Sequence, residues 1–370
     1  MIIGIPKEIK EDEYRVGMVP SGAELLKKHG HEILVETGAG EGCRIPDDEY
    51  VKAGATILKS AAEIYANAEL IIKVKEPLKR EYDLMRENQI LFAYLHLAPA
   101  PELTAALLDK KVIAIAYETI QLQDGSLPLL VPMSEVAGRM AVQIGAHFLE
   151  KTQGGRGVLL GGVPGVHRGR VTIIGAGTVG RASAKIAVGM GADVIIIDID
   201  QARLSYMDDI FGNRITTLVS NPENIFSSIK DSHLVIGSVL IPGARAPMLV
   251  TRNMVKEMKS GAVIVDVSID QGGCVETSKP TTHKHPTFVV DNVIHYCVPN
   301  MPGVVARTST FALTNITLPY AIKLADLGLE KAAAQDPALA KGINCYKGSV
   351  THENVALALN YIYTPLRFSV

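Results

Sequence analysis

The feature that most constrains the fold is a β-branched run that leads through a glycine-rich turn into a helical pattern. Residues 171–174 are predicted to form a strand, and the glycines that follow have the spacing G-x-G-x-x-G. Gly175 permits a tight turn, Gly177 lets a pyrophosphate approach the backbone, and Gly180 lets the helix lie close to the sheet. The amides and dipole at the helix N-terminus then bind the anion. The pattern predicts a Rossmann-type dinucleotide site.

The next predicted strand, residues 194–197, ends in Asp198, which stands 18 residues after Gly180. A carboxylate at this place accepts hydrogen bonds from the adenosine ribose and repels a 2′-phosphate, which favours NAD as the cofactor. Arg203, five residues further on, complicates this prediction. An arginine near the strand end can neutralise a 2′-phosphate, so NADP stays open on the residues alone.

Short apolar runs alternate with amphipathic segments along most of the chain, as is typical of an α/β fold with parallel sheets. The 370 residues suit two domains at roughly 150 residues each. We predict two doubly wound parallel-sheet domains, both Rossmann-like, with a cleft between them. The predicted strands are 2–5, 32–35, 70–75, 89–97 and 112–117 in the first domain, and 171–174, 194–197, 234–239, 263–267, 288–290 and 295–298 in the second.

The domain boundaries are predicted from where this alternation starts and stops. The nucleotide-binding domain covers residues 129–306 and opens with a long amphipathic helix. After residue 307 the pattern is helical with no further strand, and we expect this tail to pack on the first unit. The substrate domain is therefore discontinuous, residues 1–128 plus 307–370. At its first helix, Ser21 and Glu24 have the spacing of a capping box.

Composition excludes several classes of protein. The charge is balanced, with 37 Lys and Arg against 39 Asp and Glu, and 47% of residues are hydrophobic, so disorder and nucleic-acid binding through bulk charge are both disfavoured. The four cysteines form no C-x-x-C pair, and no apolar run reaches membrane-spanning length. We expect a cytoplasmic protein without a disulfide framework, a membrane partner or a nucleic-acid partner.

Four polar residues stand at or beyond predicted strand ends, where open α/β sheets bind their ligands. Lys75 and His96 close two strands of the first domain, Arg15 follows its first strand, and Asp270 follows residues 263–267. Each also has an ordinary structural explanation: a solvated lysine, an arginine paired with nearby acidic residues, a core histidine with satisfied hydrogen bonds, and a turn aspartate. Both explanations stay open for each residue taken alone.

Taken together, the four residues are more informative. Arginine binds a carboxylate through two parallel hydrogen bonds, and histidine titrates near neutral pH and transfers protons. A guanidinium, an ammonium, an imidazole and a carboxylate beside a nicotinamide would suffice to act on a small oxo acid. The combination predicts an oxidoreductase that acts on a small oxo acid, with Arg15, Lys75, His96 and Asp270 as the candidate residues of its site.

A metal site is a weaker alternative. The pairs His283 with His285 and His295 with Cys297 resemble metal ligands, but they flank a predicted strand, and no C-x-x-C or H-E-x-x-H motif supports them. We therefore predict no metal. The chain also has neither a Walker A loop nor a G-x-S-x-G elbow, which disfavours ATP chemistry and serine hydrolysis.

Eight segments in order give the chain a strong resemblance to one family, that of L-alanine dehydrogenase and the NAD-binding subunit of proton-pumping transhydrogenase. They are residues 4–8 (GIPKE), 13–16 (EYRV), 74–77 (VKEP), 92–97 (FAYLHL), 132–139 (PMSEVAGR), the Gly175 motif, 266–273 (DVSIDQGG) and 295–302 (HYCVPNMP). Departures are small: Pro299 and Arg170 stand where less rigid or less bulky residues are expected.

The resemblance implies NAD-dependent deamination of L-alanine to pyruvate and ammonia, and the reverse reaction, by a homo-oligomer that is usually a hexamer. It implies that Arg15 and Lys75 bind the substrate, that His96 is the acid/base, and that Asp270 serves the ammonia or water step. A transhydrogenase subunit and a non-catalytic nucleotide-binding protein remain alternatives. The implied cofactor contacts, beyond the three glycines, are Ser134, Thr178, Val179, Asp198, Arg203, Ser220, Val239, Leu240, Val267, Ser268, Ile269, Asp270, Lys279, Val298, Pro299, Asn300 and Met301.

Overall fold

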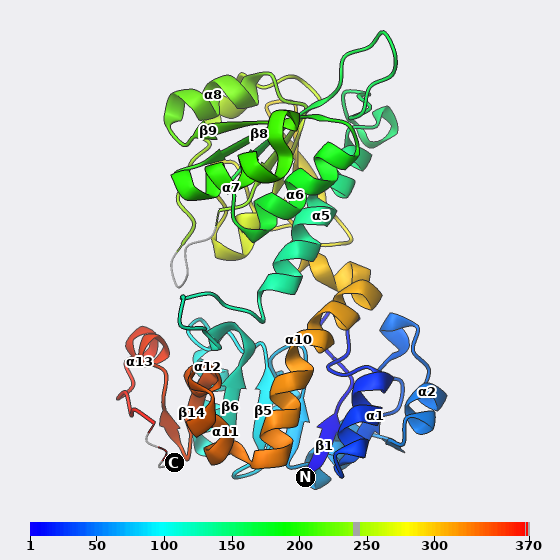
Figure 1. The fold of residues 1–370 in the computed structure, drawn as a ribbon, viewed down its shortest axis with the longest axis vertical. Helices are drawn as coiled ribbons and strands as arrows, with labels where there is room; N and C mark the ends of the chain where they lie inside the picture. The colour runs from blue at the N-terminus through cyan, green and yellow to red at the C-terminus, as the bar shows by residue number, and fades with distance from the viewer. Residues whose placement is uncertain (240–244, 367, 369–370) are drawn as a thin grey trace. The chain divides into compact units, whose positions relative to one another are not determined.

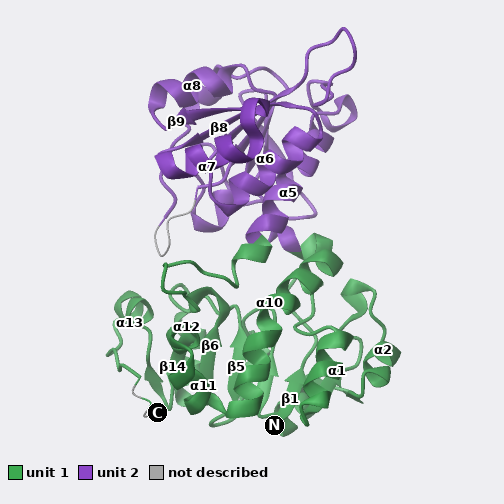
Figure 2. Cartoon of the chain, in the orientation of Figure 1, with its two compact units in different colours: residues 1–133, 303–370 green, residues 134–302 purple. Residues whose placement is uncertain are grey.

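The computed structural model describes residues 1–239, 245–366 and 368. The chain forms two compact units, which Figure 2 distinguishes by colour. Unit 1 is Met1–Met133 with Gly303–Val370, and unit 2 is Ser134–Pro302. Unit 2 is thus inserted in the sequence of unit 1, and each unit has its own sheet.

The sheet of unit 1 has the order β15-β14-β6-β5-β4-β1-β2-β3 (Figure 1). Strands β1 to β6 are parallel, and their order, 3-2-1-4-5-6, is that of a doubly wound Rossmann sheet, which reverses direction between β1 and β4. The strands are β1 Ile2–Ile5, β2 Glu32–Glu36, β3 Thr56–Leu58, β4 Leu70–Ile72, β5 Ile90–Ala93, β6 Ile113–Ala116, β14 Ile343–Tyr346 and β15 Ser349–Val350.

The prediction of no strand after residue 307 was wrong. Strands β14 and β15 pair antiparallel and extend the sheet at the β6 edge. They have only four and two residues, and β14 meets β6 with a shifted register, so neither shows a clear alternation in the sequence. Their formation depends on the edge that β6 offers.

Eight α-helices are described in unit 1, and Figure 1 shows α1 and α10 over the same face of its sheet. The predicted capping box was wrong, because Pro20 takes the first helical turn and Val19 is the N-cap, with no side-chain cap. The helices are α1 Pro20–Lys28, α2 Asp47–Lys52, α3 Ala61–Asn67, α4 Pro101–Asp109, α10 Ala306–Leu327, α11 Leu329–Gln335, α12 Pro337–Gly342 and α13 Glu353–Leu359.

Unit 2 has a second doubly wound sheet, of order β12-β13-β11-β10-β7-β8-β9, parallel except for the edge strand β12. Its strands are β7 Arg170–Ile174, β8 Asp193–Asp198, β9 Ile215–Val219, β10 Leu234–Gly237, β11 Val263–Asp266, β12 Thr287–Val290 and β13 Val293–Tyr296. Its helices are α6 Thr178–Gly189, α7 Gln201–Phe211, α8 Pro222–Lys230 and α9 Arg252–Lys256, and α5 Val131–Phe148 begins in unit 1 and continues into unit 2.

Both sheets are largely apolar inside. Strands β4, β5 and β6 are buried along their whole length, as expected for parallel strands covered on both faces. Burial continues past the hydrogen-bonded strands, for example at Val74 and Leu95. Several predicted strands therefore ran past their observed ends, most of all two in unit 1: β4 ends at Ile72 and β5 at Ala93, so Lys75 and His96 lie in the loops that follow. In unit 2, the strand predicted at 295–298 is β13, which lies two residues earlier.

Short 3-10 segments complete the described structure: η1 Glu41–Cys43, η2 Lys79–Leu84, η3 Tyr117–Thr119, η4 Lys151–Gln153, η5 Gly212–Arg214, η6 Val267–Gln271 and η7 Met301–Val305. All four cysteines are buried and free. Among the described residues, no helix combines the length and the apolar character that crossing a bilayer requires.

Candidate active site

Four neighbouring parallel strands of unit 1, β6, β5, β4 and β1, end at the same edge of the sheet. Predicted site residues follow three of them: Arg15 after β1, Lys75 after β4 and His96 after β5. Arg15 and Lys75 thus follow the two strands between which the strand order reverses, where open α/β sheets bind ligands. Glu118 follows β6 and was missed by the sequence analysis, although the same strand-end rule would have selected it.

Arg15 is buried and donates hydrogen bonds to both carboxylate oxygens of Glu13, a residue of its own loop. Its Nε donates to Glu13 Oε1 at 2.6 Å, its Nη2 to Glu13 Oε2 at 2.5 Å, and its Nη1 to Met133 Sδ at 3.0 Å. Burial opposes the charged forms of both partners, but their mutual hydrogen bonds and charges outweigh it, so the pKa of Glu13 is lowered and that of Arg15 is raised. Arg15 is therefore a fixed cation held in one orientation by a bidentate pair.

Lys75 is a second cation in the same region. Its Nζ lies 6.0 Å from the centre of the Tyr94 ring, and the Tyr94 hydroxyl donates to the carbonyl of Leu129 at 2.6 Å. Burial and the positive charge of Arg15 lower the pKa of Lys75. An ammonium in this environment is stabilised by an added anion, because a carboxylate would offset both the desolvation and the repulsion.

His96 has a backbone φ of 47°, in the left-handed region that non-glycine residues seldom adopt. Glu118 holds this turn, since the main-chain N–H groups of Leu95 and His96 donate to its carboxylate, the latter at 2.6 Å. The His96 ring stacks parallel to Tyr94, and its side chain is 49% exposed. His96 is thus not a core histidine: its imidazole is exposed to solvent, with Nδ1 3.8 Å from Glu118 Oε1.

In unit 2, the glycine turn lies between β7 and α6. Gly175 has φ +105° and approaches Ser238, and a Cβ on Gly180 would lie 1.8 Å from the carbonyl oxygen of Gly175. Both glycines are therefore required by the packing of the protein backbone and not only by a bound nucleotide. A Cβ on Gly177 would meet only Arg203, at 4.0 Å, so the space beside its backbone is open, as the approach of a pyrophosphate requires.

Asp198 ends β8 and is buried. Its carboxylate accepts hydrogen bonds from the main-chain N–H groups of Ala176, at 2.5 Å, and Asp200, at 2.8 Å, which ties the strand end to the glycine turn. Arg203 lies near both aspartates, with Nη1 3.9 Å from Asp198 and Nε 3.4 Å from Asp200. Two carboxylates thus face one exposed guanidinium, and this balance favours ribose hydroxyls over a 2′-phosphate.

The loop after β11 is organised by Asp266, a residue that the sequence analysis did not select. Its buried carboxylate accepts from the main-chain N–H groups of Ser268, at 3.1 Å, and Cys274, at 3.0 Å, and burial raises its pKa. The Ser268 hydroxyl in turn accepts from the Val239 amide at 2.9 Å. This network supports the η6 segment, on which Asp270 is exposed.

The other predicted cofactor residues mostly follow strands of this sheet. Leu240 lies outside the described residues, Ser134 is on α5, and the exposed Lys279 has its Nζ 4.6 Å from the ring centre of Phe288. Asp198 is the last residue of β8, Thr178, Val179 and Gly180 begin α6, and Arg203 lies on α7. The loops at the carboxyl ends of β7, β9, β10, β11 and β13 carry Gly175, Gly177, Ser220, Val239, Val267, Ser268, Ile269, Asp270, Val298, Pro299, Asn300 and Met301. The structure therefore brings most of the set to one edge of the sheet.

Two of the four alternative metal ligands, His295 and Cys297, make other contacts. His295 is buried, with Nε2 2.7 Å from the Thr277 hydroxyl and Nδ1 3.0 Å from a main-chain oxygen, and burial lowers its pKa. Cys297 Sγ contacts a serine hydroxyl. Across residues 1–239 and 245–366, no three His, Cys, Asp or Glu side chains are grouped so as to hold a metal ion.

The fold and the strand-end residues define a two-unit Rossmann protein with a glycine-rich turn of the dinucleotide-binding type in one unit and two cationic side chains after neighbouring strands in the other. Models of the alanine dehydrogenase/PNT family match the chain, the N-terminal domain over residues 4–137 and the C-terminal domain over residues 141–353. The chain belongs to this family.

Individual relatives agree with the family models. The chain is 59% identical to an alanine dehydrogenase of Methanococcus maripaludis, with 99% of this chain and 98% of that protein covered. A solved L-alanine dehydrogenase is 53% identical, with a TM-score of 0.95, and covers 97% of this chain and 99% of its own. A solved transhydrogenase of Sinorhizobium meliloti is 25% identical, with a TM-score of 0.82 and coverage of 95% and 99%. The similarity to the transhydrogenase is thus much more distant.

Proposed function

We propose that the protein catalyses the NAD-dependent oxidative deamination of L-alanine to pyruvate and ammonia, and the reverse reductive amination. The observation that carries the proposal is the pair of cations, Arg15 and Lys75, at the point of strand reversal in a chain 59% identical to an alanine dehydrogenase. The test is NADH absorbance in the presence of pyruvate and ammonium. We expect consumption only when both are added, and absence of turnover would refute the proposal.

NAD is the cofactor of this family, and the residues of unit 2 fit it. The open space beside Gly177 at the start of α6 supports our assignment of the pyrophosphate to this turn, and we assign the ribose hydroxyls to the Asp198 carboxylate at the end of β8. When bound, NAD supplies the chemistry of hydride transfer to and from the α-carbon of the substrate. We assign the remaining cofactor contacts to the strand-end loops described above. NAD binding is thereby assigned to unit 2.

The substrate is assigned to unit 1. Both L-alanine and pyruvate carry a carboxylate, for which Arg15 offers a preoriented guanidinium and Lys75 an ammonium of lowered pKa. In our assignment, the two cations neutralise the carboxylate and polarise the substrate oxygen. This explains why two like charges are kept close together in a buried region.

Proton transfer is assigned to His96 and Asp270. His96 presents an exposed imidazole and takes the proton from the attacking water in the deaminating direction. Asp270, on the supported η6 segment, moves protons at nitrogen as ammonia leaves. Glu118 fixes the unusual backbone of His96 and so orients the ring.

We also propose that the protein is a cytoplasmic homo-oligomer, and specifically a hexamer. The single chain exposes large apolar side chains, among them Val166, Leu357 and Ile362, the last at 86%. In our proposal, neighbouring subunits cover part of this apolar surface. Sedimentation should give six times the chain mass of 39.7 kDa, and a monomer would contradict this proposal.

The two alternative functions lead to different experiments. A non-catalytic nucleotide-binding protein would bind NADH without consuming it in the presence of pyruvate and ammonium. A transhydrogenase subunit would require NADP and membrane partners for turnover. Turnover by the purified chain with NADH alone as the nucleotide would exclude both.

A further inference from the structure

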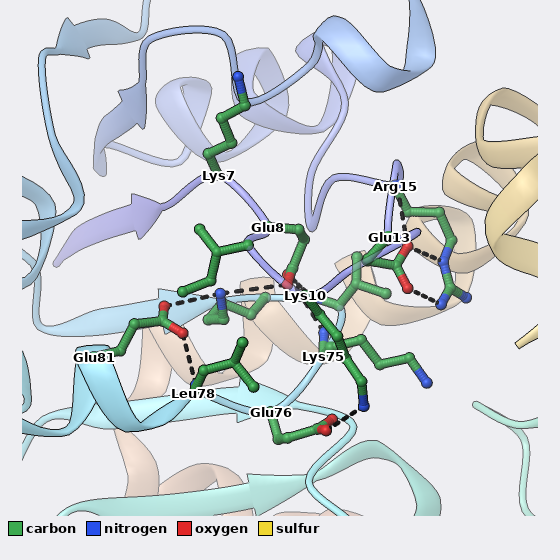
Figure 3. A network of polar contacts seen from close by, with 12 residues as sticks. Lys7, Glu8, Lys10, Glu13, Arg15, Lys75, Glu76, Leu78 and Glu81 are labelled. Carbon is green, nitrogen blue, oxygen red and sulfur yellow. Dashed lines mark hydrogen bonds and ion pairs between the residues drawn. The ribbon is translucent and has the colours of Figure 1, made fainter. Parts of the chain in front are cut away.

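A second cluster of charges lies beside the substrate site and takes no part in the proposed chemistry (Figure 3). Lys73 is fully buried, with Nζ 3.3 Å from Glu8 Oε2 and 3.0 Å from Glu81 Oε1. The side chains of Glu8 and Glu81 are only 2% and 3% exposed. Burying three charges is costly even when they are paired, so a cluster of this kind calls for a structural or functional reason.

The contacts of Glu8 supply that reason. Glu8 Oε1 accepts a hydrogen bond from the main-chain N–H of Val74 at 2.6 Å and another from that of Lys75 at 3.3 Å. Glu8 follows β1, and it reaches the segment that follows β4, the strand beside β1 in the sheet. A carboxylate from one strand end thus holds the backbone at the next strand end.

The same segment is held from its other side by β5. The Lys73 N–H donates to the Phe92 carbonyl at 3.1 Å, and the Tyr94 N–H donates to the Val74 carbonyl at 3.1 Å. On the β1 side the strand has ended at Ile5, and Glu8 Oε1 serves in place of the strand carbonyl. The backbone from which the Lys75 side chain starts is therefore fixed from both sides.

Lys73 holds this carboxylate in place and favours its charged form. Burial raises the pKa of Glu8, and the charge of Lys73 opposes that rise. The contacts of Lys73 with Glu8 and Glu81 are close ion pairs. Glu81 is itself fixed, because it accepts from the Tyr65 hydroxyl at 3.2 Å and the Leu78 amide at 2.8 Å.

We propose that Glu8 is a positioning residue for the substrate clamp: it anchors the main chain at Val74 and Lys75 and so places the Lys75 ammonium for the substrate carboxylate. This inference rests on the proposed function and goes beyond it, since Glu8 itself does not touch the substrate. Lys73, which also pairs with Glu81, supplies the positive charge that lets the Glu8 carboxylate occupy this buried position.

Two substitutions of Glu8 separate the hydrogen bonds that it accepts from the backbone from the effect of its negative charge. Glu8→Asp keeps the charge opposite Lys73 but withdraws the acceptor by one methylene, whereas Glu8→Gln keeps an acceptor of the same length and removes the charge. We expect Glu8→Asp to raise the KM for pyruvate about ten- to a hundredfold, as displacements of about 1 Å in a site do, with kcat and NADH affinity much less affected. Glu8→Gln should stay closer to wild type. The reverse order of the two variants would overturn the proposal.

A double-mutant cycle provides a readout that a merely structural role would not move. If Glu8 acts through Lys75, Glu8→Asp should change kcat/KM for pyruvate less than about twofold in a Lys75→Met background. The matched control is Glu69→Gln, because the exposed Glu69 carboxylate accepts the Ile2 amide at 2.7 Å at the opposite end of the same strand pair. This control should leave KM unchanged.

The possible outcomes are distinct. A large effect of Glu8→Asp alone that disappears in the Lys75→Met background supports the positioning role. Equal effects in both backgrounds, or a wild-type KM in Glu8→Asp, overturn it. If the wild-type protein itself shows no turnover with pyruvate, ammonium and NADH, the proposed function fails instead, and the two failures are told apart by this first measurement.

Discussion

Replacing Lys75 by methionine tests the substrate site most sharply, because the change removes a charge while nearly keeping the length and apolar stem of the side chain. A hydrogen bond to a charged group contributes about 1.5–3 kcal/mol, which corresponds to a loss of roughly 10- to 150-fold in kcat/KM for pyruvate. The loss should appear mainly in KM if Lys75 binds the carboxylate equally in the ground and transition states. Stability should not fall, because burial and the charge of Arg15 both oppose the Lys75 cation.

The lowered pKa of Lys75 adds a pH dependence with a definite sign. Its pKa in the folded protein lies below 10.5, the ordinary value of lysine. At a pH between the folded-state pKa and 10.5, Lys75 is protonated more often in the unfolded chain than in the folded protein. The contribution of Lys75 to the free energy of unfolding therefore rises with pH. Substrate binding changes the other way, because only the protonated ammonium attracts the carboxylate. In this window, kcat/KM for pyruvate should therefore fall with rising pH while the folded state gains stability.

The assay is the initial rate of NADH consumption at varied pyruvate, saturating ammonium and several pH values. Lys10→Met is the matched control, because Lys10 is a nearby lysine that pairs with Glu76 and is 40% exposed. Lys75→Met should also abolish the alkaline fall in kcat/KM, whereas Lys10→Met should preserve it. A wild-type KM for pyruvate in Lys75→Met, with NADH affinity intact, would refute the assignment of Lys75 to the substrate.

Three further predictions concern proton transfer and the cofactor. His96→Ala and Asp270→Ala should each lower kcat about a hundredfold to ten-thousandfold while NADH affinity, followed by fluorescence titration, stays intact; wild-type kcat would reject either role. Gly180→Ala should lower the melting temperature, since its Cβ would lie 1.8 Å from a carbonyl oxygen, whereas Gly177→Ala has room in the protein and should weaken NADH binding without loss of stability. Asp198→Ala should raise the ratio of NADPH to NADH turnover, because Arg203 then faces one carboxylate fewer; an unchanged ratio would contradict the specificity argument.

Strong local patterns made much of the fold predictable. The parallel strands are buried on both faces, so their continuous apolar runs mark them in the sequence. The strands that were missed are short or partly exposed edge strands, such as β3 Thr56–Leu58 and β9 Ile215–Val219. Their pairing depends on a neighbour far away in the chain, which no local pattern reveals.

The same reasoning explains what was found and missed at the candidate site. Arg15, Lys75 and His96 were selected because strand ends attract ligands, a rule that needs only sequence order. Glu8 accepts from backbone amides of the segment after β4, and this partner is known only once β1 and β4 are placed side by side. Asp266 accepts from amides of the loop that follows it, and the fold of that loop is not marked by a local pattern. Lys73 interrupts an apolar run and carries no sign in the sequence that two carboxylates would meet it.

The most direct test of the central claim is the absorbance of NADH with the purified chain, measured with pyruvate and ammonium separately and together. We predict rapid consumption only in the complete mixture, with L-alanine as the product, and much slower consumption of NADPH. NADH that stays unchanged in the complete mixture, or is consumed equally fast without ammonium, would contradict an amino-acid dehydrogenase.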